Sequence, residues 1–185
     1  MIIPNGSDLF ADPEPAGSSP VMGHSRTAAL VRDVILGGQD GLVNVLGLVL
    51  GLAVATADSR VVLTGGLAAM LSESIAMAGV AYTSRGAEAG PASSARRRAR
   101  AAFVVGSSTL LGSLVPLVWF VLLPIADAPY AAVAAAVVVL FGAGVERARV
   151  SGGRMVRAGL ELVAIGVVSA LAGYLIGRLL RAPGA

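Results

Sequence analysis

The sequence contains no cysteine and no lysine, and it has a single histidine, His24. Without cysteine, disulfides and thiolate metal sites are excluded, and one isolated histidine cannot form a metal site by itself. Aromatic residues make up only 4% of the chain, and none lies within the arginine run of residues 96–100, where a nucleic-acid-binding surface would need them for base stacking. No nucleophile is paired with a base, and there is no phosphate-binding loop. We therefore expect neither an enzyme nor a nucleic-acid-binding protein, and no cofactor.

Charged residues are scarce as well, at 14% of the chain, whereas hydrophobic residues make up 56% and the mean hydropathy is +0.81. A soluble domain of 185 residues has too small an interior to bury so much apolar surface. The chain contains five apolar segments, most of which reach the roughly 20 residues that a membrane-spanning helix needs; the fourth is short. The segments lie at about residues 34–57, 61–82, 101–123, 129–145 and 158–177.

The sequence therefore predicts an all-α membrane protein with five transmembrane helices per protomer. Residues 1–25 combine proline, glycine, serine and acidic residues without apolar periodicity, so we expect a disordered cytoplasmic tail there. Residues 26–182 then form the five-helix transmembrane domain. Only Asp58, Ser59 and Arg60 separate the first two predicted spans, which makes these spans an antiparallel hairpin.

The arginines predict how the spans cross the membrane, because basic residues concentrate in the cytoplasmic loops. With a cytoplasmic N-terminus, eleven arginines lie inside and only Arg60, Arg178 and Arg181 lie outside. We therefore expect a multi-pass protein of the cell membrane whose N-terminus is cytoplasmic. The arginine run at residues 96–100 is expected to contact the headgroups of anionic membrane lipid.

Glycines recur four residues apart in three places, a spacing that allows helices to approach closely. The pairs are Gly37 and Gly41, Gly47 and Gly51, and Gly173 and Gly177. Packing within one protomer is the simpler explanation of each pair. Because five spans are few for enclosing a polar path, we also expect a homodimer with the path near its interface.

Two acidic residues, Asp40 and Glu73, lie inside the first two predicted spans. An ionisable group at membrane depth is costly unless it is paired, hydrated or bound to a cation, so it indicates a functional site. At about 1.5 Å per residue, Asp40 lies level with Met77 in the antiparallel hairpin, and Asn44 lies level with Glu73 one turn deeper. Asp40 and Asn44 are four residues apart, as are Glu73 and Met77, so each pair shares a helix face.

These four residues offer carboxylate, amide and thioether groups to one space, with Met70 one turn further along. Adding a thioether to oxygen ligands shifts the preference from Mg²⁺ or Ca²⁺ towards a later divalent ion such as Fe²⁺. Desolvation favours the neutral form of a carboxylate and a bound cation favours the charged form, which gives a physical basis for proton-for-metal exchange. Two alternatives stay open: Asp40 could cap a helix break at the glycines around it, and Glu73 could be a neutral residue hydrogen-bonded across helices.

The stretch RDVILGGQDGLV at residues 32–43 resembles the R-D-x-I-L-G-x-x-D-G-L-V signature of the vacuolar iron transporter family. The resemblance covers all five spans, including LTGGLAAMLSESIAMAGVAYTSRGAE in the second and LLGSLVPLVWFVLLP in the third. It implies a dimeric five-helix transporter that moves Fe²⁺, and in some members Mn²⁺, out of the cytoplasm in exchange for protons. By position, Asp40 and Met77 correspond to family residues associated with the translocation path. Glu73 matches an acid that occurs in some branches.

The chain departs from the family pattern in two places. Many members have a glutamate before the aromatic residue near the end of the second span, where this chain has Ala81 before Tyr82. Better-studied members also have a long glutamate-rich cytoplasmic domain between spans two and three. Here that region is only RGAEAGPASSARRRAR, with Glu88 as its one acid. Metal capture would then depend on a partner or on the membrane path alone.

The sequence thus predicts that Asp40, Asn44, Glu73 and Met77 bind a divalent metal ion, Fe²⁺ or Mn²⁺, as transported substrate. Protons and membrane lipid are the other expected partners. One competing hypothesis is a non-transporting membrane module that anchors or regulates an iron-storage partner. Another is a conduit for protons alone.

Overall fold

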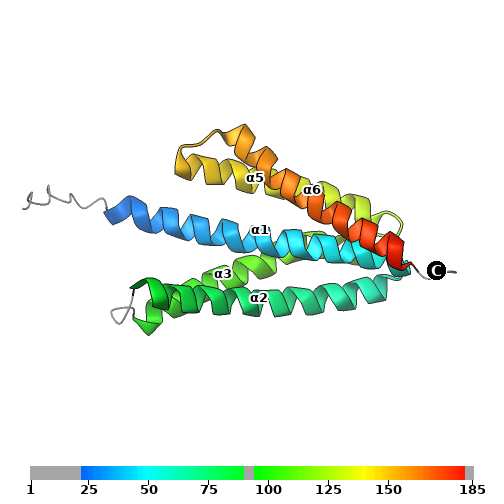
Figure 1. The fold of residues 1–185 in the computed structure, drawn as a ribbon, viewed down its shortest axis with the longest axis horizontal. Coiled ribbons are helices and arrows are strands. Elements are labelled where there is room, and N and C mark those ends of the chain that lie inside the picture. Colours follow the sequence, from blue (N-terminus) through cyan, green and yellow to red (C-terminus); the bar gives the residue numbers. More distant parts are fainter. Residues whose placement is uncertain (1–21, 90–93, 182–185) are drawn as a thin grey trace, which may run out of the picture.

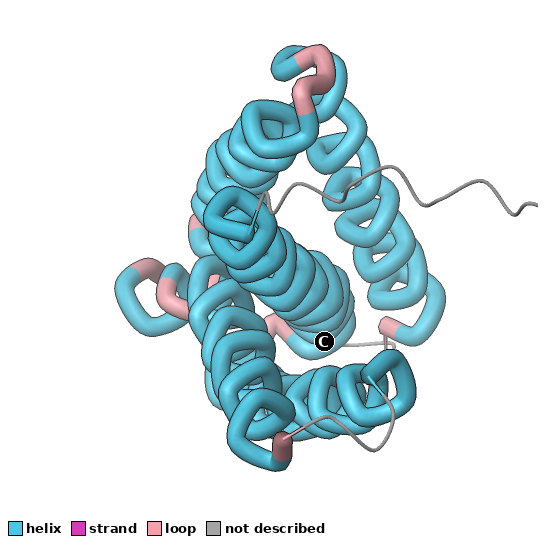
Figure 2. The backbone as a smooth tube through the Cα atoms, turned by 90° about the vertical axis from the view of Figure 1, so that its left-hand side faces the viewer, coloured by secondary structure: helices cyan, strands magenta, loops and turns pink. Residues whose placement is uncertain are grey.

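The structure is a computed structural model that describes residues 22–89 and 94–181. Within these residues all regular secondary structure is helical, as the end-on view in Figure 2 shows. The elements are α1 (Met22–Thr56), α2 (Ser59–Ala89), α3 (Ala95–Leu117), α4 (Trp119–Leu122), α5 (Ala128–Ser151) and α6 (Met155–Leu180).

In the described part of the chain, five helical segments are long and apolar enough to cross a membrane, so the prediction of five spans is confirmed. The fourth segment is α5, whose 24 residues extend well beyond the predicted end at residue 145. Helix α1 begins at Met22, inside the predicted tail of residues 1–25. The rest of that predicted tail, residues 1–21, lies outside the described residues.

The third span consists of α3 and α4, which are separated only by Val118. Helix α3 contains Pro116, which has no amide hydrogen to donate. Val118 nevertheless keeps helical angles, with φ −58° and ψ −32°, and its amide donates to the carbonyl oxygen of Leu114 at 3.0 Å. The span therefore continues past the proline in nearly the same direction.

Helix α1 runs through the middle of the bundle, with α5 and α6 on one side and α2 and α3 on the other (Figure 1). It contacts α2, α3, α5 and α6. The beginnings of α1, α3 and α6 lie at the same end of the bundle as the ends of α2 and α5 (Figure 1). This arrangement gathers the arginines of these segments at one end, as the arginine-based orientation requires.

A two-residue turn joins α1 to α2. Ala57 has a positive φ of 50°, the left-handed conformation that commonly closes a helix. The Oδ1 atom of Asp58 accepts a hydrogen bond from the backbone amide of Arg60 at 2.7 Å and so satisfies a free amide at the start of α2. The linker is therefore Ala57 and Asp58 rather than the predicted Asp58 to Arg60. Because the turn is so short, α2 must return alongside α1.

Close backbone contact joins α1 to α3. A Cβ atom added at Gly41 would collide with the backbone of Thr109, and one added at Gly112 would collide with the carbonyl oxygen of Gly38. Gly37 is buried against the side chain of Ser108. Helix α1 is continuous through these glycines, so the alternative in which Asp40 caps a helix break is wrong.

A second close contact joins α1 to α6. A Cβ atom added at Gly173 would collide with the carbonyl oxygen of Gly47, and one added at Gly177 would collide with that of Gly51. The Ser169 hydroxyl donates to the backbone carbonyl of Val43 at 2.8 Å across the same interface. The glycine pairs of the sequence therefore serve packing within the protomer, and the simpler explanation is confirmed.

We expect Gly173→Ala to lower the melting temperature of the detergent-solubilised protein by several degrees. Its methyl group would meet the Gly47 carbonyl oxygen, and overpacking of a tight contact costs about 1–3 kcal/mol. Gly142→Ala is the matched control, because a Cβ at that helical position has nothing within 4 Å and alanine gains about 1 kcal/mol in helix propensity. Equal melting temperatures for the two variants would contradict the close contact between α1 and α6.

Candidate functional site

The central polar cluster consists of Asp40 and Asn44 on α1 and Glu73 on α2. The Asn44 Nδ2 atom donates a hydrogen bond to Glu73 Oε1 and lies 3.5 Å from Asp40 Oδ1. One amide group therefore lies between two carboxylates from different helices. The predicted pairing of Asn44 with Glu73 at one depth is confirmed.

The two carboxylates of this cluster have no cationic partner among the described residues. Asp40 and Glu73 are half-buried, and the ion pairs that do form involve other acids. The Asn44 amide can donate hydrogen bonds but cannot neutralise charge. Since two adjacent carboxylates inside a membrane span repel each other, the cluster requires protons or a bound cation.

Met77 lies on α2 four residues after Glu73 and is half-buried. The spacing puts it on the same face of α2 as Glu73, one helical turn away. That Met77 binds metal beside Asp40 stays a prediction. Met70, by contrast, is only 7% exposed and belongs to the hydrophobic core, so it is a packing residue.

No group of three or more histidine, cysteine, aspartate or glutamate side chains that could hold a metal occurs within the described residues. One protomer therefore supplies two carboxylates and an amide, with a thioether one turn away. Divalent transition metals commonly take four to six ligands, so this set leaves positions open for water or for further protein groups.

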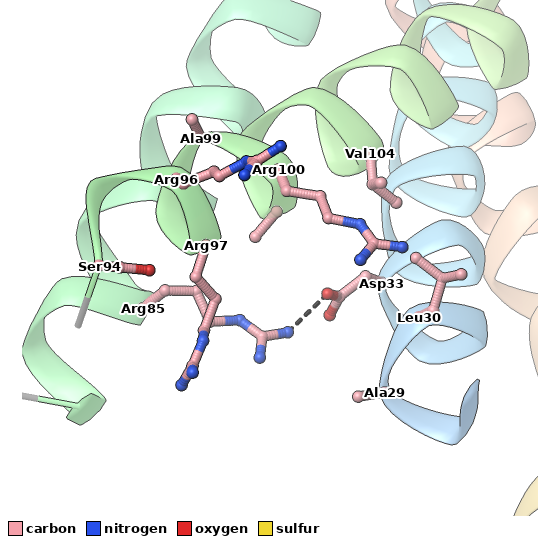
Figure 3. Close-up of a pocket in the computed structure, with 11 residues that line it drawn as sticks. Ala29, Leu30, Asp33, Arg85, Ser94, Arg96, Arg97, Ala99, Arg100 and Val104 are labelled. Carbon is pink, nitrogen blue, oxygen red and sulfur yellow. Dashed lines mark hydrogen bonds and ion pairs between the residues drawn. The ribbon is translucent and has the colours of Figure 1, made fainter. Parts of the chain in front are cut away.

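An ion pair between Asp33 and Arg85 joins α1 to α2 nearer the arginine-rich end. Arg85 Nη2 lies 2.5 Å from Asp33 Oδ2, and the two side chains are 29% and 13% exposed (Figure 3). Asp33, Asp40 and Asn44 lie on one face of α1, because they are seven and four residues apart. Sequence reasoning missed this pair. The seven-residue spacing between the two aspartates was the available signal for Asp33.

A further ionic cluster joins α5 to α6 at the same end of the bundle. Glu161 accepts from Arg147 Nη2 at 3.1 Å and from Arg157 Nε at 3.2 Å. Arg149 pairs with Glu146 on α5 at 2.5 Å. All of these side chains are about half exposed or more, so the contacts contribute little to stability. These ion pairs lie at the protein surface and do not include the residues of the central cluster.

The fold and the central cluster define a helical multi-pass membrane protein with an acidic site inside its spans. A family model described as the VIT family matches residues 31–101 and 87–178. The chain belongs to the VIT family, and the expected membership of the vacuolar iron transporter family is confirmed. A search of curated proteins finds no match. Members of this family are transporters, so membership indicates metal ion transport.

The hydrogen bond between Asn44 and Glu73 can be tested by a double-mutant cycle. We expect Asn44→Ala and Glu73→Ala to be coupled by about 0.5–1.5 kcal/mol, the range seen for polar pairs between membrane helices. The measurement is the free energy of unfolding in mixed detergent micelles. Asn44→Ala combined with Asp127→Ala is the control, because Asp127 lies in the turn before α5, and these two changes should be additive. A coupling energy of zero in the test cycle would show that the bond contributes nothing.

Proposed function

We propose that this protein carries Fe²⁺, and also Mn²⁺, out of the cytoplasm across the cell membrane in exchange for protons. The observation that supports this proposal most directly is the pair of carboxylates, Asp40 and Glu73, which share the Asn44 amide and have no cationic partner among the described residues. Family membership supports transport of a metal ion.

The chemistry of the cluster favours a later divalent metal as the transported ion. Carboxylate and amide oxygens alone would suit Mg²⁺ or Ca²⁺, and the thioether of Met77 makes the set softer. Fe²⁺ and Mn²⁺ tolerate such mixed sets of ligands. The metal is a transported substrate, so it must also leave the site. An incomplete set of protein ligands is therefore an advantage.

Exchange with protons follows from the charge of the site. When the metal is bound, Asp40 and Glu73 are both charged and neutralise it. When the metal leaves, two bare carboxylates would face each other at membrane depth, so protons replace the metal. A proton gradient directed into the cytoplasm would therefore drive the metal outwards.

The direction of transport rests on the expected orientation of the bundle. The arginine-rich end is cytoplasmic under the positive-inside rule. Between that end and the central cluster lies the pair formed by Asp33 and Arg85, which the metal would pass first. Asp33 adds an acid to the same face of α1, so α1 presents a line of polar groups from the cytoplasmic end inwards.

A homodimer would complete the site. Asn44 is exposed on the surface of the protomer although it lies in the middle of a membrane span, and an uncovered amide in lipid is costly. Beside Glu73, the outer face of α2 exposes the small residues Ser72, Ala76 and Gly79. A Cβ atom at Gly79 would meet nothing within 4 Å. Small residues of this kind allow another helix to pack closely. We propose that a second copy packs here and adds its own ligands.

Transport itself can be tested in liposomes that hold a metal-sensitive dye. We expect Fe²⁺ under reducing conditions, and Mn²⁺, to enter only when a pH gradient is imposed. Asp40→Asn and Glu73→Gln should each lower the initial rate by more than about 10-fold, since even outer-shell changes cost about 10- to 100-fold in metal affinity.

Asp127→Asn is the matched control for this experiment, because Asp127 is an exposed acid in the turn before α5. Its rate should equal that of the wild type. If folded wild-type protein moves no metal, the transport proposal fails and the module that anchors an iron-storage partner is favoured. Acidification without any metal dependence would instead favour a conduit for protons.

The dimer can be tested by disulfide crosslinking, and the absence of cysteine from the chain makes every introduced cysteine unique. We expect Ser72→Cys and Ala76→Cys to give a crosslinked dimer in membranes after mild oxidation. Leu171→Cys, on the exposed face of α6, is the control and should stay monomeric. More dimer for the α6 variant than for the α2 variants would overturn this interface.

A further inference from the structure

A basic cavity lies between α1, α2 and α3 at the arginine-rich end of the bundle (Figure 3). It has a volume of about 1040 Å³. Its charged walls are Asp33 of α1, Arg85 of α2, and Arg96, Arg97 and Arg100 of α3. The central cluster of Asp40, Asn44 and Glu73 does not line it.

The charges of this cavity are unbalanced. Asp33 is the one acid in the lining, and it already pairs with Arg85. Arg96, Arg97 and Arg100 are exposed and form no ion pair with any described residue. Arginine presents a planar set of donors that fits the oxygens of a phosphate group. The cavity therefore has the charge and the donors for a phosphate ligand.

The start of α3 strengthens this preference for an anion. Helix α3 has 23 residues and no acidic residue in its first turn. Ser94, the residue before its first turn, makes no side-chain cap hydrogen bond and lines the cavity. The positive end of the helix dipole therefore faces the same space as the arginines.

The remaining lining of the cavity is apolar. Ala29 and Leu30 come from α1, and Ala101 and Val104 come from α3. Leu30 is 38% exposed. A basic, anion-binding site with an apolar wall at the end of the membrane spans matches an anionic lipid, whose phosphate lies at the surface and whose chains enter the bilayer.

We propose that this cavity binds the phosphate headgroup of an anionic phospholipid, with Arg96, Arg97 and Arg100 as the phosphate ligands and the apolar wall against the first part of the acyl chains. A bound phosphate would lie against the pair formed by Asp33 and Arg85. The site is therefore in contact with the ion pair that joins α1 to α2.

The proposal is tested by measuring binding of dioctanoyl phosphatidylglycerol to the full chain in neutral detergent by native mass spectrometry. We expect Arg97→Gln with Arg100→Gln to weaken binding by about 30-fold, since each arginine near an anionic surface contributes about fivefold. Arg154→Gln is the matched control: Arg154 is an exposed arginine at the same end of the bundle, outside this cavity, and its loss should leave binding unchanged.

Asp33→Asn is a second test that a folding defect cannot mimic. Removing the one acid of the cavity frees Arg85 and should tighten lipid binding by about fivefold. Equal binding by the wild type and the double arginine variant would overturn the proposal. So would equal binding of dioctanoyl phosphatidylcholine, which is zwitterionic and has no net charge. If inorganic phosphate displaces the lipid at equal concentration, the lipid assignment is wrong and the cavity is a site for free anions.

Discussion

The structure depends on one constraint, which is that two carboxylates must be held side by side within membrane-spanning helices without a fixed counterion. Asn44 meets part of this constraint, because its amide donates to Glu73 and lies 3.5 Å from Asp40. An arginine in its place would permanently neutralise one of the two carboxylates. An amide keeps the two acids together and leaves their charge for a proton or a metal to balance.

The packing of α1 explains how so polar a cluster keeps its geometry. Gly37 and Gly41 bring the backbone of α1 against α3, and Gly47 and Gly51 bring it against α6 further along the helix, where added methyl groups would collide. Those contacts fix the rotation of α1, and Asp33 and Asn44 then contact Arg85 and Glu73 of α2. The two-residue turn at Ala57 and Asp58 then fixes the height of α2. Close packing therefore positions the acids, and no strong interaction between the acids themselves is needed.

Much of this arrangement was predictable from the sequence. Helical rise in a tight hairpin was enough to pair Asn44 with Glu73, because depth depends only on residue count. Residue count does not determine how a helix is rotated about its own axis. For that reason Met70 was expected near the cluster, whereas it packs in the core. The pair of Asp33 and Arg85 was missed because a long arginine side chain reaches beyond its own helix face. Glycine spacing predicted close packing, but it could not tell which helix each pair contacts.

The segment between the second and third spans is short and basic, with Glu88 as its one acid, so under the proposed function the membrane cluster alone would select the ion. The most direct test of the central claim is to count protons released when Mn²⁺ binds to the detergent-solubilised protein, by titration calorimetry in buffers of different ionisation enthalpy. Competition between metal and protons at Asp40 and Glu73 predicts proton release with each bound ion, and less release for Asp40→Asn. Binding of Mn²⁺ to the wild type with no release of protons would contradict the account.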